Sequence, residues 1–154
     1  MSLIAVPPAP ASELPIDCGA FLPAIDIAAA RAAMRIDGAV TKERLRAALV
    51  TAALSVADEL SQWIADQQAA GHATLADVQA PVIDGVSAHV HRFIVAVRCT
   101  AAAELIERMR DYDTTNEGHL NADKLAPAID ELRRDARWAI SDILGIRRTT
   151  VELI

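Results

Sequence analysis

The spacing of apolar residues between Thr41 and Gly71 is the feature that most restricts the fold of this chain. Apolar residues recur there at intervals of three and four and share one face of a helix: Leu45, Leu49, Ala52, Val56, Leu60, Trp63 and Ile64. Thr41 can cap the start of this helix and Gly71 can end it. About 29 residues at ~1.5 Å each give a helix of ~43 Å, longer than the ~30 Å width of a small domain. The pattern therefore predicts one long helix that dominates the fold.

Two further helices are predicted on either side of this pattern. Asp26 can cap a short helix that runs to about Arg35 and is ended by Gly38. Ser87 can cap a longer helix, because helical spacing of apolar residues continues from there to about Asp111.

The last helical pattern covers residues 125–143, with Gly145 at its end. Pro127 is expected in its first turn or at a kink, because a proline farther inside a helix removes a hydrogen bond. The hydrophilic stretch 113–118 separates this helix from the one before. Residues 72–84 contain turn chemistry without a sustained period and are predicted to be a connection.

Both ends of the chain are predicted to be extended. Residues 1–20 contain four prolines, which lack the backbone N–H donor and fix φ. The apolar side chains of this arm suit docking on its own core or on a neighbouring molecule. Residues 146–154 are rich in β-branched side chains and suit a strand. Such a strand needs a partner chain or another segment of this chain to satisfy its backbone groups.

The composition supports an all-α fold, a bundle of three long helices plus one short N-terminal helix. Alanine, the best helix former, supplies 32 of 154 residues, and only five residues are aromatic. Because alanine contributes little burial, the core is expected to be thin and to gain from neighbouring molecules. The predicted organisation is an extended N-terminal arm (1–20), a helical domain (21–145) and a C-terminal extended, β-like arm (146–154).

Charge and motifs exclude several classes of function. The net charge of -6 has the wrong sign for coating nucleic acid, so any DNA contact is expected to be local. No stretch approaches ~20 consecutive apolar residues, and no contact with a membrane is expected. The usual catalytic, cofactor and metal-binding signatures are missing, so we predict no catalytic, cofactor-binding or metal-binding residues. His89 and His91 resemble a metal pair, but on a helix their rings point apart.

The arginines near the C-terminus are the candidate interface residues. Five fall within sixteen residues: Arg133, Arg134, Arg137, Arg147 and Arg148. One interpretation is a solvated face with i, i+4 pairs such as Asp130 with Arg134. The alternative is contact with acidic protein or DNA, because guanidinium groups suit carboxylate and phosphate alike. Val151 and Ile154 of the C-terminal arm extend the candidate interface. The two tryptophans are expected as core anchors, which can also serve an assembly surface.

A series of short motifs runs in a fixed order from residue 21 towards the C-terminus. They are Phe21-x-Pro23-x-Ile-Asp26, Arg31-x-x-Met-Arg35, Arg44-Leu-Arg, Ala69-Ala-Gly71, Leu75-Ala-Asp77-Val78, Ile83-Asp84-Gly85-x-Ser87, Glu107-Arg108-x-Arg110-Asp111 and Asp130-Glu-Leu-x-Arg134-Asp135-x-Arg137-Trp138-Ala139. The last, a long charged stretch, is the most specific. In this order the motifs resemble those of the head completion proteins of tailed bacteriophages with contractile tails.

The resemblance implies a structural virion protein at the head–tail neck, made in the host bacterial cytoplasm. Such a protein is a small helical adaptor that binds the portal ring after DNA packaging, retains the genome and provides the tail attachment surface. The implied partners are copies of itself in a ring, dodecameric by family analogy, the portal protein and a tail-side terminator or completion protein, with local contact to packaged DNA as a further option. The alternative function, motivated by the amphipathic stripes alone, is a cytoplasmic helical regulatory or protein-interaction module.

Overall fold

The computed structural model describes residues 13–34, 40–112 and 116–147 of the chain. Within these residues four α-helices follow one another: α1 (Ile27–Ala33), α2 (Lys42–Ala69), α3 (Ala88–Tyr112) and α4 (Asn116–Leu144). Between α2 and α3 lie a short 3-10 helix, η1 (Leu75–Asp77), and an antiparallel hairpin of β1 (Val82–Ile83) and β2 (Val86–Ser87). The mostly helical fold that the sequence predicts is confirmed.

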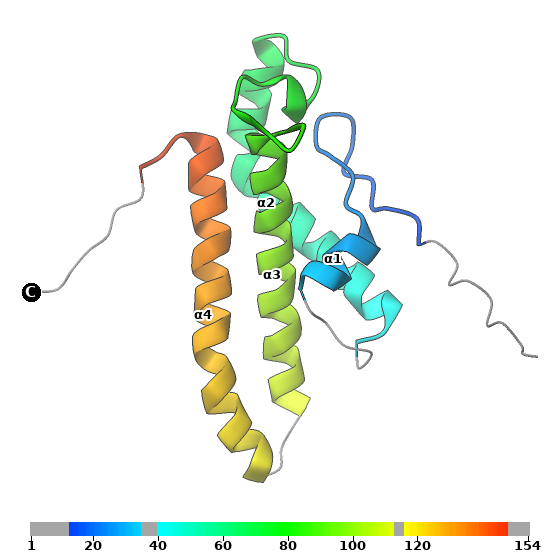
Figure 1. Cartoon of the computed structure of the whole chain (residues 1–154), viewed down its shortest axis with the longest axis vertical. Helices are drawn as coiled ribbons and strands as arrows, with labels where there is room; N and C mark the ends of the chain where they lie inside the picture. Colours follow the sequence, from blue (N-terminus) through cyan, green and yellow to red (C-terminus); the bar gives the residue numbers. More distant parts are fainter. Residues whose placement is uncertain (1–12, 35–39, 113–115, 148–154) are drawn as a thin grey trace, which may run out of the picture.

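α3 lies at the centre of the helical arrangement. It runs antiparallel to α4 and packs against it over much of its length (Figure 1). α2 packs obliquely against another side of α3 and contacts α4 much less. α1 lies against α2. Because α3 contacts both other long helices, it links them into one body.

The helices begin where the sequence places capping side chains. Asp26, Thr41 and Ser87 each accept a hydrogen bond from a backbone N–H two or three residues later, at 2.9, 3.3 and 3.3 Å. These bonds satisfy N–H groups that have no partner inside the helix. α1 ends at Ala33, slightly before the expected end, and Gly38 lies outside the described residues.

Two helices end at the predicted glycines. Gly71 follows α2 with φ +97° and Gly145 follows α4 with φ +71°, a conformation that glycine adopts readily. The residue after each glycine donates its N–H to a carbonyl five residues earlier, at 3.1 and 2.9 Å. This is the Schellman arrangement, which satisfies the last carbonyls of a helix.

The start of α4 differs from the prediction. The helix begins at Asn116, whereas the apolar pattern begins at Leu125. Pro127 therefore lies well inside α4, which excludes the first turn, one of the two positions expected for it. The predicted break at 113–118 also extended too far into the helix. The residues between Asn116 and Leu125 are mostly polar, so hydrophobic periodicity carries no signal for a helix there.

The all-α prediction also omitted the hairpin between α2 and α3. Its turn is formed by Asp84 and Gly85, which have φ values of 51° and 71°. Positive φ at both central residues is what a type I′ turn requires, and this turn matches the twist of antiparallel strands. The two strands are only two residues each, too short for the alternation of apolar and polar residues that reveals a strand in a sequence.

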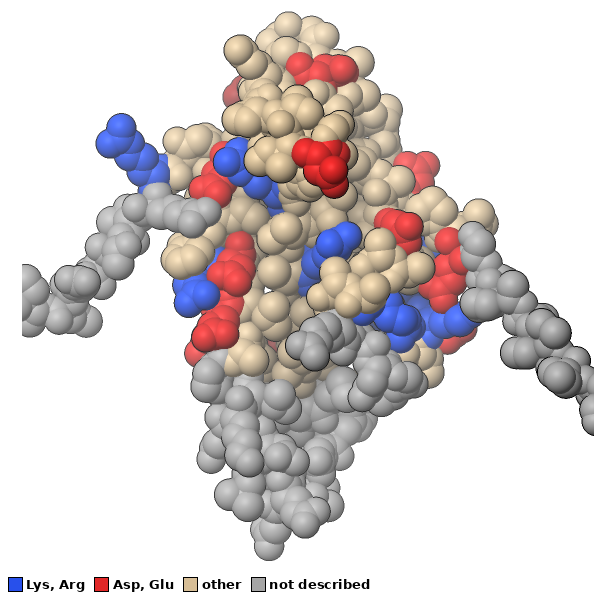
Figure 2. All heavy atoms as spheres, viewed as in Figure 1, with Lys and Arg blue, Asp and Glu red and all other residues tan. Residues whose placement is uncertain are grey.

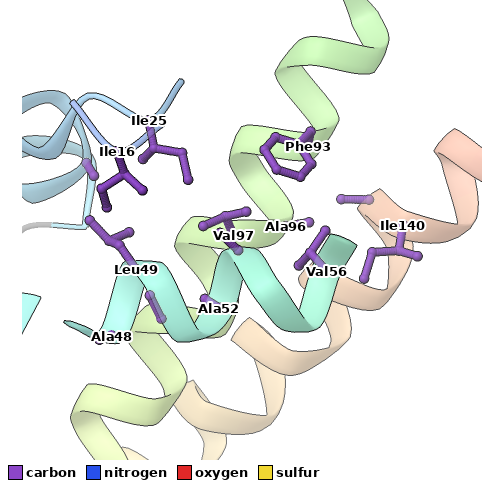
Figure 3. Packing of buried hydrophobic residues seen from close by; sticks show 14 of the residues in the cluster. Ile16, Ile25, Ala48, Leu49, Ala52, Val56, Phe93, Ala96, Val97 and Ile140 are labelled. Atoms are coloured by element: carbon purple, nitrogen blue, oxygen red, sulfur yellow. The ribbon is translucent and has the colours of Figure 1, made fainter. Parts of the chain in front are cut away.

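The core is built mainly from aliphatic side chains, of which alanine is the most frequent, and it contains Phe93. The residues drawn in Figure 3 include Leu49, Ala52, Val56, Phe93, Ala96, Val97 and Ile140. Ala52 and Ala96 are both 0% exposed. A methyl group at such positions allows two helices to approach closely, and protein interiors leave little free space around it. Part of the high alanine content therefore serves close helix packing.

The described part of the predicted N-terminal arm lies on the chain's own core. Ile16 and Ile25 exchange two backbone hydrogen bonds of 2.9 Å, and both side chains are buried. Arg46 of α2 donates a hydrogen bond of 2.9 Å to the carbonyl oxygen of Leu14. The arm was expected to dock either on its own core or on a neighbouring molecule, and Ile16 docks on the core of its own chain. Residues 1–12 lie outside the described residues.

We expect Ala96→Leu to lower the free energy of unfolding by about 1–3 kcal/mol, because the added carbon atoms have no space in a closely packed core. Urea unfolding followed by circular dichroism measures the change. Val95→Leu is the matched control: Val95 is 42% exposed, so the same measurement should change by less than about 0.5 kcal/mol. An Ala96→Leu variant as stable as the wild type would contradict close packing at this position.

Candidate protein-interaction surface

Two of the predicted interface arginines form ion pairs within the chain. Arg133 of α4 lies 2.7 Å from a carboxylate oxygen of Glu107 on α3. Arg134 lies 3.1 Å from the carboxylate of Asp135, and its guanidinium carbon is 4.7 Å from the ring centroid of Trp138. Arg134 therefore pairs with Asp135, whereas the sequence suggested a pair with Asp130. The side chains involved are partly exposed, so these pairs contribute little to stability.

Arg137 is exposed beside a groove of about 430 Å³ between α2, α3 and α4. Arg133 lines the same groove, together with Glu59 and Glu104. Arg137 forms no ion pair with the residues that the structure describes. Its guanidinium group is thus available to a partner's carboxylate or phosphate.

A second groove, of about 300 Å³, is lined by other residues of α3 and α4. Its apolar lining includes Val95 and Trp138, which are 42% and 38% exposed. Arg92 and Asp142 also line it and are joined by an ion pair of 3.8 Å. Exposed aromatic and aliphatic side chains framed by charges are typical of protein interfaces.

The two tryptophans therefore have different environments. Trp63 of α2 is half-buried and packs against the core, as expected of an anchor. Trp138 has an exposed face in the second groove. The sequence contained a signal for this surface: Val95 lies off the apolar stripe of α3, and an apolar residue off the stripe faces away from the core.

The structure brings three of the seven predicted interface residues together on α4: Arg133, Arg134 and Arg137. Arg147 follows the end of α4 and is exposed. The other three lie outside the described residues: Arg148, Val151 and Ile154. Figure 2 shows basic and acidic side chains next to each other over α4. The arginines are thus part of a surface of mixed charge, together with the exposed face of Trp138.

The two histidines at the start of α3 contact different neighbours. The ring of His89 is buried and lies edge-on to Trp63, with 5.5 Å between ring centroids. The Nε2 atom of His91 is 2.9 Å from the carbonyl oxygen of Ile83 in the hairpin. In the part of the chain that the structure describes, no three His, Cys, Asp or Glu side chains are grouped to hold a metal ion.

Both cysteines are free thiols, and both are half-buried. Burial raises the pKa of Cys18, and Asp17 adds to this effect. Burial likewise raises the pKa of Cys99, with a further contribution from Asp135 that Arg98 opposes. A raised pKa lowers the fraction of thiolate, which is the reactive form of cysteine. Neither thiol therefore has the environment of a catalytic nucleophile.

Comparison with known proteins identifies the kind of molecule that carries this surface. The family model "Phage head completion protein (GPL)" matches residues 16–154. The chain is 39% identical over 148 residues to the head completion/stabilization protein of Escherichia phage P2, covering 96% of this chain and 88% of the relative. No solved structure gives a significant match.

This chain belongs to the phage head completion protein family. It is a structural protein of a bacteriophage and not an enzyme, and the resemblance of its motifs is confirmed. Among the helices that the structure describes, none combines the length and apolar character needed to cross a bilayer.

His89 provides a test of the buried end of α3. Burial lowers its pKa below the usual 6.5, as does nearby Arg92, while a hydrogen bond with the backbone of Gln79 partly opposes the shift. The unfolded chain therefore binds a proton at higher pH than the folded chain. We expect stability to be full above pH ~6.5 and to fall as the pH drops from there towards the lowered pKa.

Urea unfolding at several pH values, in the wild type and in His89→Gln, isolates this contribution. The difference in pH dependence between the two proteins should have the stated sign, and the imidazole signals of His89 should titrate below 6.5 in an NMR experiment. A midpoint at or above 6.5 would show that the ring is not held in its neutral form.

Proposed function

We propose that this chain is a ring-forming adaptor at the phage neck, which binds the portal ring after DNA packaging, retains the genome and provides the tail attachment surface. The family match over residues 16–154 is the observation that carries the proposal, because it covers all four helices. Head completion requires contacts with other virion proteins. In this proposal those partners are the portal protein and a tail-side terminator or completion protein.

The surface of α4 supports contact with proteins more than with DNA. Arg133 and Arg134 already bind carboxylates of the same chain, which reduces their attraction for phosphate. Trp138 and Val95 offer apolar contact area next to these charges. Affinity for duplex DNA depends mainly on positive charges facing phosphates, and this mixed surface provides few. Any contact with packaged DNA is accordingly local and secondary.

A thin core supports assembly into a ring. Subunits that contact each other through two different surfaces close into a ring when the rotation between them allows it. The number of subunits in this proposal is twelve, by analogy with related adaptors. The C-terminal arm, residues 146–154, serves as a connection from the helical domain (21–145) to a neighbouring molecule, whereas the N-terminal arm (1–20) is anchored on its own core through Ile16.

Particles made without this protein test the proposal directly. We expect full heads that lose their DNA and do not join tails. In wild-type particles, negative-stain images of the neck and chemical cross-linking should place the protein next to the portal. Stable, tail-competent full heads formed without the protein would contradict the proposal.

The apolar groove gives a prediction for assembly. We expect Trp138→Ala to keep the helical circular dichroism signal but to reduce binding to neck complexes about 30-fold, the effect of losing a hot spot of ~2 kcal/mol. Leu54→Ala removes a side chain that is 62% exposed on α2 and serves as the control. If both variants bound neck complexes equally well, Trp138 would not be part of the interface.

The C-terminal arm gives a second prediction. Deleting Ile146 to Ile154 should leave the helical signal of the free protein unchanged, because α4 already ends at Leu144. The deletion should impair incorporation into particles, since a terminal strand needs a partner surface. Incorporation at the wild-type level, measured by protein gels of purified particles, would show that the arm is not a connection.

A further inference from the structure

The stretch of chain that includes the hairpin is acidic. Between Arg46 and Arg92 the sequence contains five Asp and Glu residues and no Lys or Arg. Asp66 near the end of α2, Asp77 of η1 and Asp84 in the hairpin turn belong to this stretch. Figure 2 shows acidic side chains at the end formed by these segments, with the nearest basic side chains beside and below them.

The same end exposes branched apolar side chains. Ile83 of β1 and Val86 of β2 are cross-strand partners, so their side chains share one face of the hairpin, and they are 63% and 37% exposed. Val82 of β1 is 68% exposed and lies on the opposite face. We call Ile83 and Val86, with Asp84 in the turn between them, the hairpin surface. Exposed apolar side chains next to negative charges suit a partner segment that carries both apolar residues and positive charges.

The C-terminal arm of this chain has that chemistry. It begins with Ile146, Arg147 and Arg148 and continues with Thr149-Thr-Val-Glu-Leu-Ile154. Its two arginines complement Asp84 of the hairpin surface and the acidic stretch to which it belongs. Its β-branched and leucine side chains match the apolar residues of β1 and β2.

The arm also starts at the end of the molecule that carries the hairpin. The ion pair between Arg92 and Asp142 joins the beginning of α3 to the end of α4. The hairpin directly precedes α3, and the first residues of the arm, Ile146 and Arg147, directly follow α4, so they lie at the same end as the hairpin (Figure 1). Nine extended residues span up to ~30 Å, enough to reach an adjacent molecule at the same height.

We propose that the C-terminal arm of one copy binds the hairpin surface of the neighbouring copy. The inference rests on the proposed ring and names one of its contacts. The two described residues of the arm face solvent: Ile146 is 57% exposed, and Arg147 is exposed as well. Subunits arranged around a common axis place each arm level with a neighbour's hairpin. The two surfaces differ, so the contact is heterologous and can be repeated around a ring.

A peptide of residues 146–154 tests this contact in trans. The receptor is the full chain carrying Arg147→Glu and Arg148→Glu, so that its own arm does not compete. We expect a fluorescent peptide to bind this receptor, with affinity falling several-fold between low and high salt because charges are involved. The same peptide with both arginines replaced by glutamate should bind at least ~10-fold more weakly, because attraction to the acidic stretch becomes repulsion.

Variants of the receptor locate the site. Ile83→Thr with Val86→Thr keeps branched side chains on the two strands, makes them more polar and should weaken peptide binding at least ~10-fold. Leu54→Gln is the matched control, since Leu54 is 62% exposed on α2. Peptide binding that is unchanged by the hairpin variant, or weakened equally by the control, overturns the proposal.

Analytical ultracentrifugation tests whether the arm binds a neighbouring copy or its own chain. The wild-type chain should associate as its concentration rises towards ~1 mM, and the arginine-reversed chain should stay monomeric. The arm would bind the hairpin surface of its own chain if the wild-type chain stayed monomeric and did not bind the peptide that the arginine-reversed chain binds. That result would overturn the contact between copies. Loss of the neck function is a separate outcome: if the peptide does not bind but heads still require the protein, only this inference fails.

Discussion

The packing of α3 against both other long helices is the contact on which the rest of the structure depends. Phe93, Ala96 and Val97 of α3 are completely buried. α4 is held almost entirely through α3, and the hairpin is positioned because it leads directly into the first turn of α3. A change in the orientation of α3 would therefore move the second groove, the α4 arginines and the hairpin together.

The same packing explains why so many apolar side chains remain on the surface. Alanine-lined contacts bring the helices close together, but they bury little area for each residue. Val95, Trp138 and the hairpin residues Val82 and Ile83 are consequently left outside the core. In a subunit of an assembly, such residues gain burial from neighbouring molecules, so a thin core and an extensive interface are two consequences of one composition.

The distribution of charge is more informative than the net charge of -6. Basic and acidic side chains alternate over α4, where Arg133 and Arg134 are paired. The end that carries the hairpin has acidic side chains without basic ones between Arg46 and Arg92. The molecule therefore has patches of different charge. Contacts between two different patches of identical subunits need such a difference.

The sequence by itself determined where most helices begin and end and to which family the chain belongs. The caps Asp26, Thr41 and Ser87, and the stops Gly71 and Gly145, act through hydrogen bonds to residues close in the chain, so local sequence is sufficient. The start of α4 and the two-residue strands carry no periodic signal and were missed. Only the tertiary structure decided that Trp138 is exposed while Trp63 packs on the core, and that Arg133 pairs with Glu107 of another helix. These outcomes depend on how α2 and α4 lie on α3, which is set by contacts between residues far apart in the sequence.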